Sequence, residues 1–251
     1  MAVGIRKVGV VGLGTMGAGI AQLAIEAGFD TVGREVDLLR AEGGRDKIAH
    51  FLTRKVDKRQ LTHEARDAAV ARLTLTTELA DLADCDVVIE AAFEDLAVKH
   101  ELFRALQAVV RDDTILATNT SALSVTEIAA VLERPERAVG MHFFNPAPLM
   151  PLVEIVRAER TTEQSVDTAF AFAERIGKKP VRCLDTPGFI VNRILIPLLN
   201  DCIRVIDEAG ITVEDLDTAM RYGSPSSPNS IPSKCMECMD HGPMSGPTKT
   251  T

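Results

Sequence analysis

KVGVVGLGTMGAGIAQLAIEAG, residues 7–28, joins a strand-like segment, a glycine-rich turn and a helix-like segment without a break. Residues 7–12 are short, apolar and rich in valine, which is typical of a strand buried on both faces of a parallel sheet. Gly12, Gly14 and Gly17 then form the pattern G-x-G-x-x-G. The first glycine of such a pattern permits a tight turn, the second lets backbone approach a pyrophosphate, and the third lets the helix pack closely on the strand.

The helix that follows, expected over residues 15–26, directs its first backbone amides at the phosphates of a bound nucleotide. Leu13, Thr15 and Met16 fill the turn between the glycines, so they are expected to contact the nucleotide as well. A glycine-rich turn can also form for structural reasons alone, but the strand before it and the helix after it are the context that dinucleotide binding requires. The segment therefore predicts a dinucleotide-binding fold.

The end of the second expected strand, residues 29–36, indicates which dinucleotide is bound. Glu35 lies there, 23 residues after Gly12. This is close to the spacing of about 20 residues expected for the acid that hydrogen-bonds the ribose 2′-hydroxyl, so it favours NAD over NADP. Two other interpretations stay open, because Arg34 could meet a 2′-phosphate and Glu35 could be a solvated loop residue.

Composition places the chain among soluble globular proteins. It has 251 residues, 46% of them hydrophobic, and a formal net charge of −8, which argues against nucleic-acid binding because that needs a basic surface. No long apolar segment precedes the first strand, and the apolar stretch 189–206 is interrupted by polar and charged residues, so neither a signal peptide nor a membrane span is expected. Five widely spaced cysteines indicate reduced thiols and a cytoplasmic protein.

Strand-like and helix-like segments alternate up to about residue 185, which predicts an α/β fold with a Rossmann-type doubly wound sheet. Beyond the first two strands, strands are expected over 86–95, 114–118, 138–143, 152–156 and 181–184, and helices over 38–58, 63–71, 96–110, from 124 and over 162–176. We expect an NAD-binding domain over residues 1–185 and the start of an all-helical C-terminal domain over 186–223, with helices at 189–208 and from 212. Residues 224–251 are rich in Ser, Pro and Gly and are expected to be disordered.

Four polar residues stand at or just beyond the expected ends of strands: Ser121, His142, Glu154 and Asn192. Oxidising a hydroxyl with NAD needs a base that takes the hydroxyl proton while a hydride leaves the same carbon. Histidine suits that task near neutral pH when a carboxylate orients it and stabilises the imidazolium. His142 and Glu154 can lie on neighbouring strands that face one cleft, although spacing alone leaves a core histidine and an edge-strand glutamate equally open.

Three segments carry a resemblance to a known family: NTSALSV (119–125), GMHFFNPAPLMPLVEIV (140–156) and DTPGFIVNRILIPLLNDCIRVIDEAG (185–210). Together they resemble the L-3-hydroxyacyl-CoA dehydrogenase family, especially its bacterial 3-hydroxybutyryl-CoA members, and the match runs in order from Lys7 to about Gly223. The resemblance implies NAD-dependent interconversion of short-chain (S)-3-hydroxyacyl-CoA and 3-ketoacyl-CoA, in fatty-acid β-oxidation or butanoate metabolism.

The resemblance also implies roles for single residues. His142 corresponds to the family's catalytic base, Glu154 to its carboxylate partner, and Ser121 and Asn192 to the groups that hydrogen-bond the substrate oxygen. By the same matching, further NAD contacts are expected from Glu94, Lys99, Asn119 near the nicotinamide, Ser121 and Asn145. No metal is implied.

Coenzyme A is held in the family partly by a basic segment after the second strand, which corresponds here to Arg54, Lys55, Lys58 and Arg59. Lys58 is the one substrate contact that we predict from this segment, and a solvated helix face is an equally open interpretation. Where the family often has a small hydroxyl residue, this chain has Phe51.

The chain departs from the family after Gly223. Family members continue with further helices that close the cleft and form a homodimer, whereas this sequence continues with a polar tail, so we expect a truncated C-terminal domain in which the homodimer is not assured. The tail holds Cys235 and Cys238 as C-x-x-C, which we interpret as accidental rather than as a metal or redox site. Two other functions stay open: a sugar-acid dehydrogenase of the gulonate type, and an NAD-binding structural protein with impaired catalysis.

Overall fold

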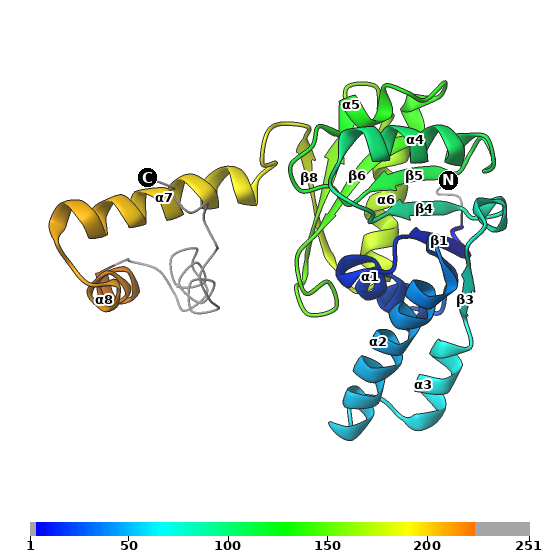
Figure 1. Ribbon diagram of the computed structural model, residues 1–251, viewed down its shortest axis with the longest axis horizontal. Coiled ribbons are helices and arrows are strands. Elements are labelled where there is room, and N and C mark those ends of the chain that lie inside the picture. Colours follow the sequence, from blue (N-terminus) through cyan, green and yellow to red (C-terminus); the bar gives the residue numbers. More distant parts are fainter. Residues whose placement is uncertain (1–3, 224–251) are drawn as a thin grey trace. The chain divides into compact units, whose positions relative to one another are not determined.

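The computed structural model describes residues 4–223 and divides the chain into two compact units, the first ending at Phe189 and the second beginning at Ile190. The first unit is a sheet of eight strands with helices on both faces (Figure 1). Its strands are β1 (Lys7–Val11), β2 (Asp30–Arg34), β3 (Leu73–Thr76), β4 (Val87–Glu90), β5 (Ile115–Thr118), β6 (Ala138–Phe143), β7 (Leu152–Arg157) and β8 (Lys179–Leu184). Its helices are α1 (Thr15–Glu26), α2 (Leu38–Asp57), α3 (His63–Val70), α4 (Leu96–Gln107), α5 (Val125–Ala129) and α6 (Glu163–Arg175), with 3₁₀ turns η1 (Leu79–Leu82) and η2 (Pro135–Arg137).

The sheet has the strand order β3-β2-β1-β4-β5-β6-β7-β8, and β1 to β6 run parallel. β7 runs antiparallel to β6, and β8 runs parallel to β7, so the last two strands point the opposite way. The physical reason is the short connection over residues 144–151, because a parallel neighbour needs a crossover of about a dozen residues or more. The predicted Rossmann-type sheet is therefore mostly, but not wholly, parallel.

The central strands are buried on both faces because helices cover the sheet from either side. On β1, Val8 and Val10 lie in one hydrophobic core with residues of α1 and α6, and Val11 lies in a second core with residues of α4 and α5. Gly9 faces the second core, since a Cβ there would lie 2.8 Å from the Leu82 side chain. The valine-rich run thus packs on both sides, as expected for an interior parallel strand.

Most helices of the first unit begin at a residue whose side chain accepts a hydrogen bond from the backbone N–H three positions ahead. These capping residues are Asp37, Thr62, Asp95, Ser124 and Thr162, at the starts of α2 to α6. The start predicted at Ser124 is confirmed, with its Oγ accepting from the Glu127 N–H at 3.2 Å. α1 has no side-chain cap because Gly14 precedes it, which leaves its first amides available to a ligand.

Three elements differ from the sequence-based expectation. β3 is not predicted by the sequence pattern, because it is only four residues long, follows α3 directly and lies at the edge of the sheet beside β2. The strand expected over 86–95 ends at Glu90, and the irregular segment 91–95 carries Glu94 beyond the sheet. The long helix expected from Phe189 begins at Val191, because Phe189 is buried and has a left-handed φ of 49°.

Within the described residues, the second unit consists of α7 (Val191–Ala209) and α8 (Val213–Gly223). The predicted start of α8 is confirmed by reciprocal bonds: the Asp215 N–H donates to Thr212 Oγ1 at 3.1 Å, and Asp215 Oδ2 accepts from the Thr212 N–H at 3.3 Å. Cys202 and Leu216 form the buried contact between the two helices. The tail that was expected to be disordered, with Cys235 and Cys238, lies outside the described residues.

No helix in residues 4–223 combines the length and the apolar character that crossing a membrane requires.

Candidate active site

The turn after β1 requires glycine at two of its three glycine positions for internal reasons. Gly12 has φ 89°, and a Cβ there would lie 2.7 Å from the carbonyl oxygen of Ala91. A Cβ at Gly17 would lie 1.7 Å from the Gly12 oxygen. By contrast, a Cβ at Gly14 would meet nothing within 4 Å. The middle glycine therefore faces open space at the N-terminus of α1, where a phosphate group fits.

A cavity of about 740 Å³ opens between this turn and the end of β2, and Glu35 lines it. The Glu35 carboxylate is held in place by backbone: Oε1 accepts from the Leu13 N–H at 2.7 Å, and Oε2 accepts from the Val36 N–H at 3.1 Å. Arg34 also lines the cavity, but its Nε donates to the Thr77 carbonyl at 3.1 Å. The carboxylate, rather than the guanidinium, is the group fixed beside the glycine-rich turn.

This first cavity fits one half of a dinucleotide. The open side of Gly14 and the uncapped amides of α1 suit a pyrophosphate, and the Glu35 carboxylate suits a ribose diol. Val36 and Phe93, which are 59% and 75% exposed, line the same cavity and offer an apolar surface to an adenine ring. The donor set is therefore that of a dinucleotide site.

A second cavity, of about 340 Å³, shares the wall residues Ala91 and Ala92 with the first. It collects seven of the residues that the sequence singled out: Met16, Glu94, Lys99, Asn119, Ser121, His142 and Asn145. They meet because the carboxyl ends of the parallel strands β1, β4, β5 and β6 lie at one edge of the sheet. Asn119 is fixed between two strands, since its Oδ1 accepts from the Phe143 N–H at 2.9 Å.

His142 and Glu154 are direct partners across the antiparallel pair β6 and β7. Nδ1 of His142 lies 2.7 Å from Oε2 of Glu154, and the two residues are 5% and 0% exposed. Because the carboxylate accepts a hydrogen bond, Nδ1 carries the proton, and Nε2 is the nitrogen that can take a proton from a ligand. The rings of Phe144 and Phe189, with centroids 4.5 Å and 5.5 Å from that of His142, fix the plane of the imidazole.

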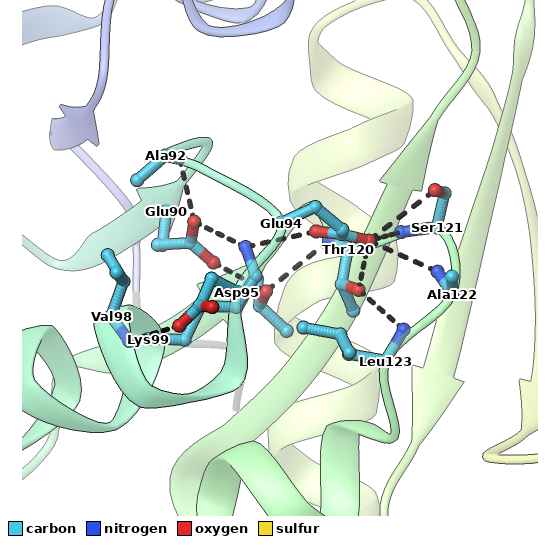
Figure 2. A network of polar contacts seen from close by, with 11 residues as sticks. Glu90, Ala92, Glu94, Asp95, Val98, Lys99, Thr120, Ser121, Ala122 and Leu123 are labelled. Carbon is cyan, nitrogen blue, oxygen red and sulfur yellow. Dashed lines mark hydrogen bonds and ion pairs between the residues drawn. The ribbon is translucent and has the colours of Figure 1, made fainter. Parts of the chain in front are cut away.

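Glu94 orders the turn that carries Ser121 (Figure 2). Its Oε1 accepts from Thr120 Oγ1 at 2.6 Å, from the Ser121 N–H at 2.8 Å and from the Ala122 N–H at 3.2 Å. Burial by itself would raise the pKa of Glu94, but these hydrogen bonds and the nearby Lys99 ammonium outweigh it and hold the pKa below its ordinary value. Glu94 is therefore a carboxylate at neutral pH.

Behind Glu94 lies a buried ion pair that sequence reasoning missed in part, because Lys99 was predicted and Glu90 was not. The side chains of Glu90 and Lys99 are 0% and 1% exposed, and Lys99 Nζ lies 2.6 Å from Glu90 Oε1. The signal for Glu90 is an acid at the end of the otherwise apolar strand VVIE, since a carboxylate buried there needs a charged partner.

A third cavity, of about 520 Å³, meets the second at Asn145. Arg54, Lys55 and Lys58, at the end of α2, contribute to its wall, and no acidic side chain of the described residues lines it. Lys55 is partly neutralised by Glu26, 2.5 Å away. The cavity therefore presents a basic wall to its contents.

The first unit does not contain every predicted residue. Asn192 is the second residue of α7 and belongs to the second unit, so its contact with the substrate oxygen stays a prediction. Arg59 follows α2 but is not among the residues that line the third cavity. In the part of the chain that the structure describes, no cluster of three or more His, Cys, Asp or Glu side chains could hold a metal ion.

Comparison with known proteins identifies the family. Residues 7–186 match the sequence model described as 3-hydroxyacyl-CoA dehydrogenase, NAD binding domain, and residues 188–231 match that of the C-terminal domain. A 3-hydroxybutyryl-CoA dehydrogenase of Bradyrhizobium diazoefficiens is 44% identical over 224 residues, which cover 89% of this chain and 76% of that protein. A 3-hydroxyadipyl-CoA dehydrogenase of Escherichia coli is 41% identical over 89% of this chain and 47% of that protein.

Among solved structures, the crystal structure of (S)-3-hydroxybutyryl-CoA dehydrogenase from Ralstonia eutropha superposes with a TM-score of 0.86 at 38% identity. The superposition covers 88% of this chain and 79% of that one. Sequence and fold agree with the site geometry. The chain therefore belongs to the 3-hydroxyacyl-CoA dehydrogenase family of NAD-dependent oxidoreductases.

Proposed function

We propose that this chain oxidises a short-chain (S)-3-hydroxyacyl-CoA, such as 3-hydroxybutyryl-CoA, to the 3-ketoacyl-CoA with NAD, and catalyses the reverse reaction, in fatty-acid or butanoate metabolism. The observation that carries the proposal is the His142–Glu154 pair at a cavity that adjoins a dinucleotide cavity on one side and a basic cavity on the other. The names of the relatives, which act on 3-hydroxybutyryl-CoA and 3-hydroxyadipyl-CoA, support the substrate class.

In the oxidation, a hydroxyl proton and a hydride leave the same carbon of the substrate. Bound NAD supplies the hydride acceptor. His142 takes the proton at Nε2, because Nδ1 is engaged by Glu154, and the buried carboxylate stabilises the imidazolium that forms. In the reduction, the imidazolium returns its proton to the keto oxygen. The Ser121 hydroxyl, which lines the same cavity as His142, hydrogen-bonds the reacting oxygen, and the contact from Asn192 stays a prediction.

The basic wall of the third cavity supports coenzyme A as the carrier of the acyl group. Coenzyme A bears phosphate groups, and Arg54, Lys55 and Lys58 provide cations with which phosphates pair. Lys55 is paired with Glu26, whereas Arg54 and Lys58 are both exposed, and we assign the ammonium of Lys58 to a phosphate of the substrate. The acyl thioester then reaches His142 past Asn145, the residue that the two cavities share.

Glu35 supports NAD rather than NADP as the coenzyme, because a fixed carboxylate at this position repels a 2′-phosphate. A cytoplasmic location is supported by free thiols at Cys85, Cys183 and Cys202. The family resemblance implies a homodimer, which stays a prediction. Light scattering tests it by measuring the molar mass in solution.

The experiment compares wild type with His142→Gln in the oxidation of NADH by acetoacetyl-CoA, and in parallel assays a sugar acid with NAD. We expect the variant to lose about 10²-fold or more in kcat, the usual contribution of a general acid or base, while NADH binding is unchanged. His63→Gln, at an exposed position in α3, is the control and should behave as wild type.

Three outcomes contradict the proposal. Equal rates for wild type and His142→Gln would show that His142 is not the catalytic base. Turnover of the sugar acid but not of acetoacetyl-CoA would show that the chain is a sugar-acid dehydrogenase. NADH binding without turnover of either substrate makes the chain a binding protein.

A further inference from the structure

The mechanism above gives no role to Glu90, although Glu90 forms one half of a fully buried ion pair with Lys99. Taking two charges out of water is so unfavourable that their attraction often only offsets it, and an apolar pair of similar volume is frequently as stable. Stability alone therefore does not explain why a charged pair lies at the end of β4.

The Glu90 carboxylate is surrounded by donors from three other segments (Figure 2). Its Oε1 accepts from the Ala92 N–H at 2.7 Å and from the Lys99 ammonium at 2.6 Å, and its Oε2 accepts from the Thr118 hydroxyl at 2.6 Å. Its backbone carbonyl accepts from the Asn119 N–H at 2.8 Å. One buried residue thus joins the ends of β4 and β5, the 91–95 segment and α4.

Segments joined in this way contribute to the walls of the second cavity. Ala92 belongs to the wall that the first and second cavities share, and Asn119 and Lys99 line the second cavity. A displacement of the Glu90 carboxylate would therefore move groups on several sides of the site.

Lys99 lies between two carboxylates, 2.6 Å from Glu90 Oε1 and 3.3 Å from Glu94 Oε2. Attraction between charges strengthens as distance and local polarity fall. The Glu90 side chain is both nearer and fully buried, whereas that of Glu94 is 39% exposed, so Glu90 holds the ammonium on the side of the sheet. Glu94 then keeps its Oε1 on the donors of the Ser121 turn.

We propose that Glu90 is a positioning residue of the dehydrogenase site: it keeps the Lys99 ammonium closer to its own carboxylate than to that of Glu94 and so keeps the Ser121 turn and the 91–92 wall in place. The inference rests on the proposed function through the role of Ser121. When the charge of Glu90 is removed, the ammonium moves toward Glu94, and the Glu94 carboxylate is drawn off the N–H groups of Ser121 and Ala122.

The test separates the charge of Glu90 from its shape. Glu90→Gln keeps the shape and loses the charge, whereas Glu90→Asp keeps the charge on a shorter side chain. We measure kcat and KM with acetoacetyl-CoA, the NADH dissociation constant by fluorescence, and Tm. Glu133→Gln, an exposed glutamate before η2, is the matched control.

For Glu90→Gln we expect kcat to fall about 10- to 100-fold at a temperature where the variant is fully folded, because small misplacements of positioned groups have effects of this size. The NADH dissociation constant should rise several-fold. Glu90→Asp should be clearly more active than Glu90→Gln, and the control should match wild type. Wild-type kcat and NADH affinity in Glu90→Gln overturn the proposal, as does a Gln variant that is more active than the Asp variant, since shape alone would then matter.

If Glu90→Gln does not fold, Thr118→Val replaces it. This variant removes one hydrogen bond to Glu90 without creating an unpaired buried charge, and it should lower kcat several-fold at nearly wild-type Tm. An unchanged kcat in Thr118→Val then overturns the proposal. A wild-type protein that binds NADH but turns over no acyl-CoA refutes the proposed function alone, because the NADH dissociation constants of the variants still test Glu90.

Discussion

Glu154→Gln removes the charge opposite His142 and leaves the shape of the side chain nearly unchanged. In the folded protein Glu154 is fully buried, and its Oε2 lies 2.7 Å from His142 Nδ1, directly across β6 and β7. The glutamine oxygen can still accept from Nδ1–H, so the neutral imidazole keeps its tautomer. What the variant loses is an attraction that arises only when His142 becomes an imidazolium during oxidation.

The size of that loss follows from burial. Breaking a buried charge pair costs about 3–5 kcal/mol, compared with about 0–1 kcal/mol for an exposed pair. Because His142 is neutral in the ground state of the oxidation and charged in its transition state, the cost falls on the barrier. At about 1.4 kcal/mol for each factor of ten, kcat should fall about 140- to 3,700-fold.

The assay is the appearance of NADH with (S)-3-hydroxybutyryl-CoA and saturating NAD at neutral pH. A fluorescence titration measures NADH binding, which should be unchanged because Glu154 lines none of the three cavities. Glu159→Gln, an exposed glutamate two residues after β7, is the control. A kcat within about tenfold of wild type, less than about 1.4 kcal/mol, would refute the role of the Glu154 charge. Parallel losses of kcat and NADH binding would instead show that Glu154 supports the folded structure of the site.

The other predictions concern the glycine-rich turn, acid stability and substrate binding. Gly17→Ala should prevent folding, because its Cβ would lie 1.7 Å from the Gly12 oxygen, whereas Gly14→Ala should keep the wild-type Tm and lose NADH affinity. Thermal denaturation and NADH titration compare the two variants. Similar Tm values for the two variants would contradict this prediction. Burial would raise the pKa of Asp185, but hydrogen bonds from Ser124, Thr126 and Val125 outweigh it and lower the pKa. The Asp185 carboxylate therefore stabilises the fold at neutral pH, and this contribution disappears as pH falls below the ordinary carboxyl pKa of about 4 and through the lowered one. Tm should accordingly fall less steeply with acid in Asp185→Asn than in wild type, and parallel curves would disprove this. Lys58→Ala should raise KM for acetoacetyl-CoA several-fold at unchanged kcat, with a smaller effect at high salt because salt screens exposed charges. Lys179→Ala, on β8, is the control. An unchanged KM for Lys58→Ala would show that Lys58 does not contact the substrate.

The sequence by itself determines the nucleotide-binding end of the molecule, because strand, turn and helix are adjacent in the chain. The helix predicted over residues 15–26 has the bounds of α1, and the position of Glu35 beside the turn follows from one further strand. Helix starts at Ser124 and Thr212 are equally local, since each depends on a side chain and an amide three residues apart. Short-range geometry of this kind leaves few alternatives.

Spacing alone did not decide whether His142 and Glu154 meet. That contact depends on β7 turning back against β6, which places the two residues opposite each other. The same holds for Glu90, whose partners Lys99 and Thr118 lie on α4 and β5 and reach it only when the sheet has assembled. β3, at the sheet edge, is a strand because β2 supplies its partner. In each case residues of different secondary-structure elements share hydrogen bonds or charges whose strength depends on burial, and only the tertiary structure creates that burial.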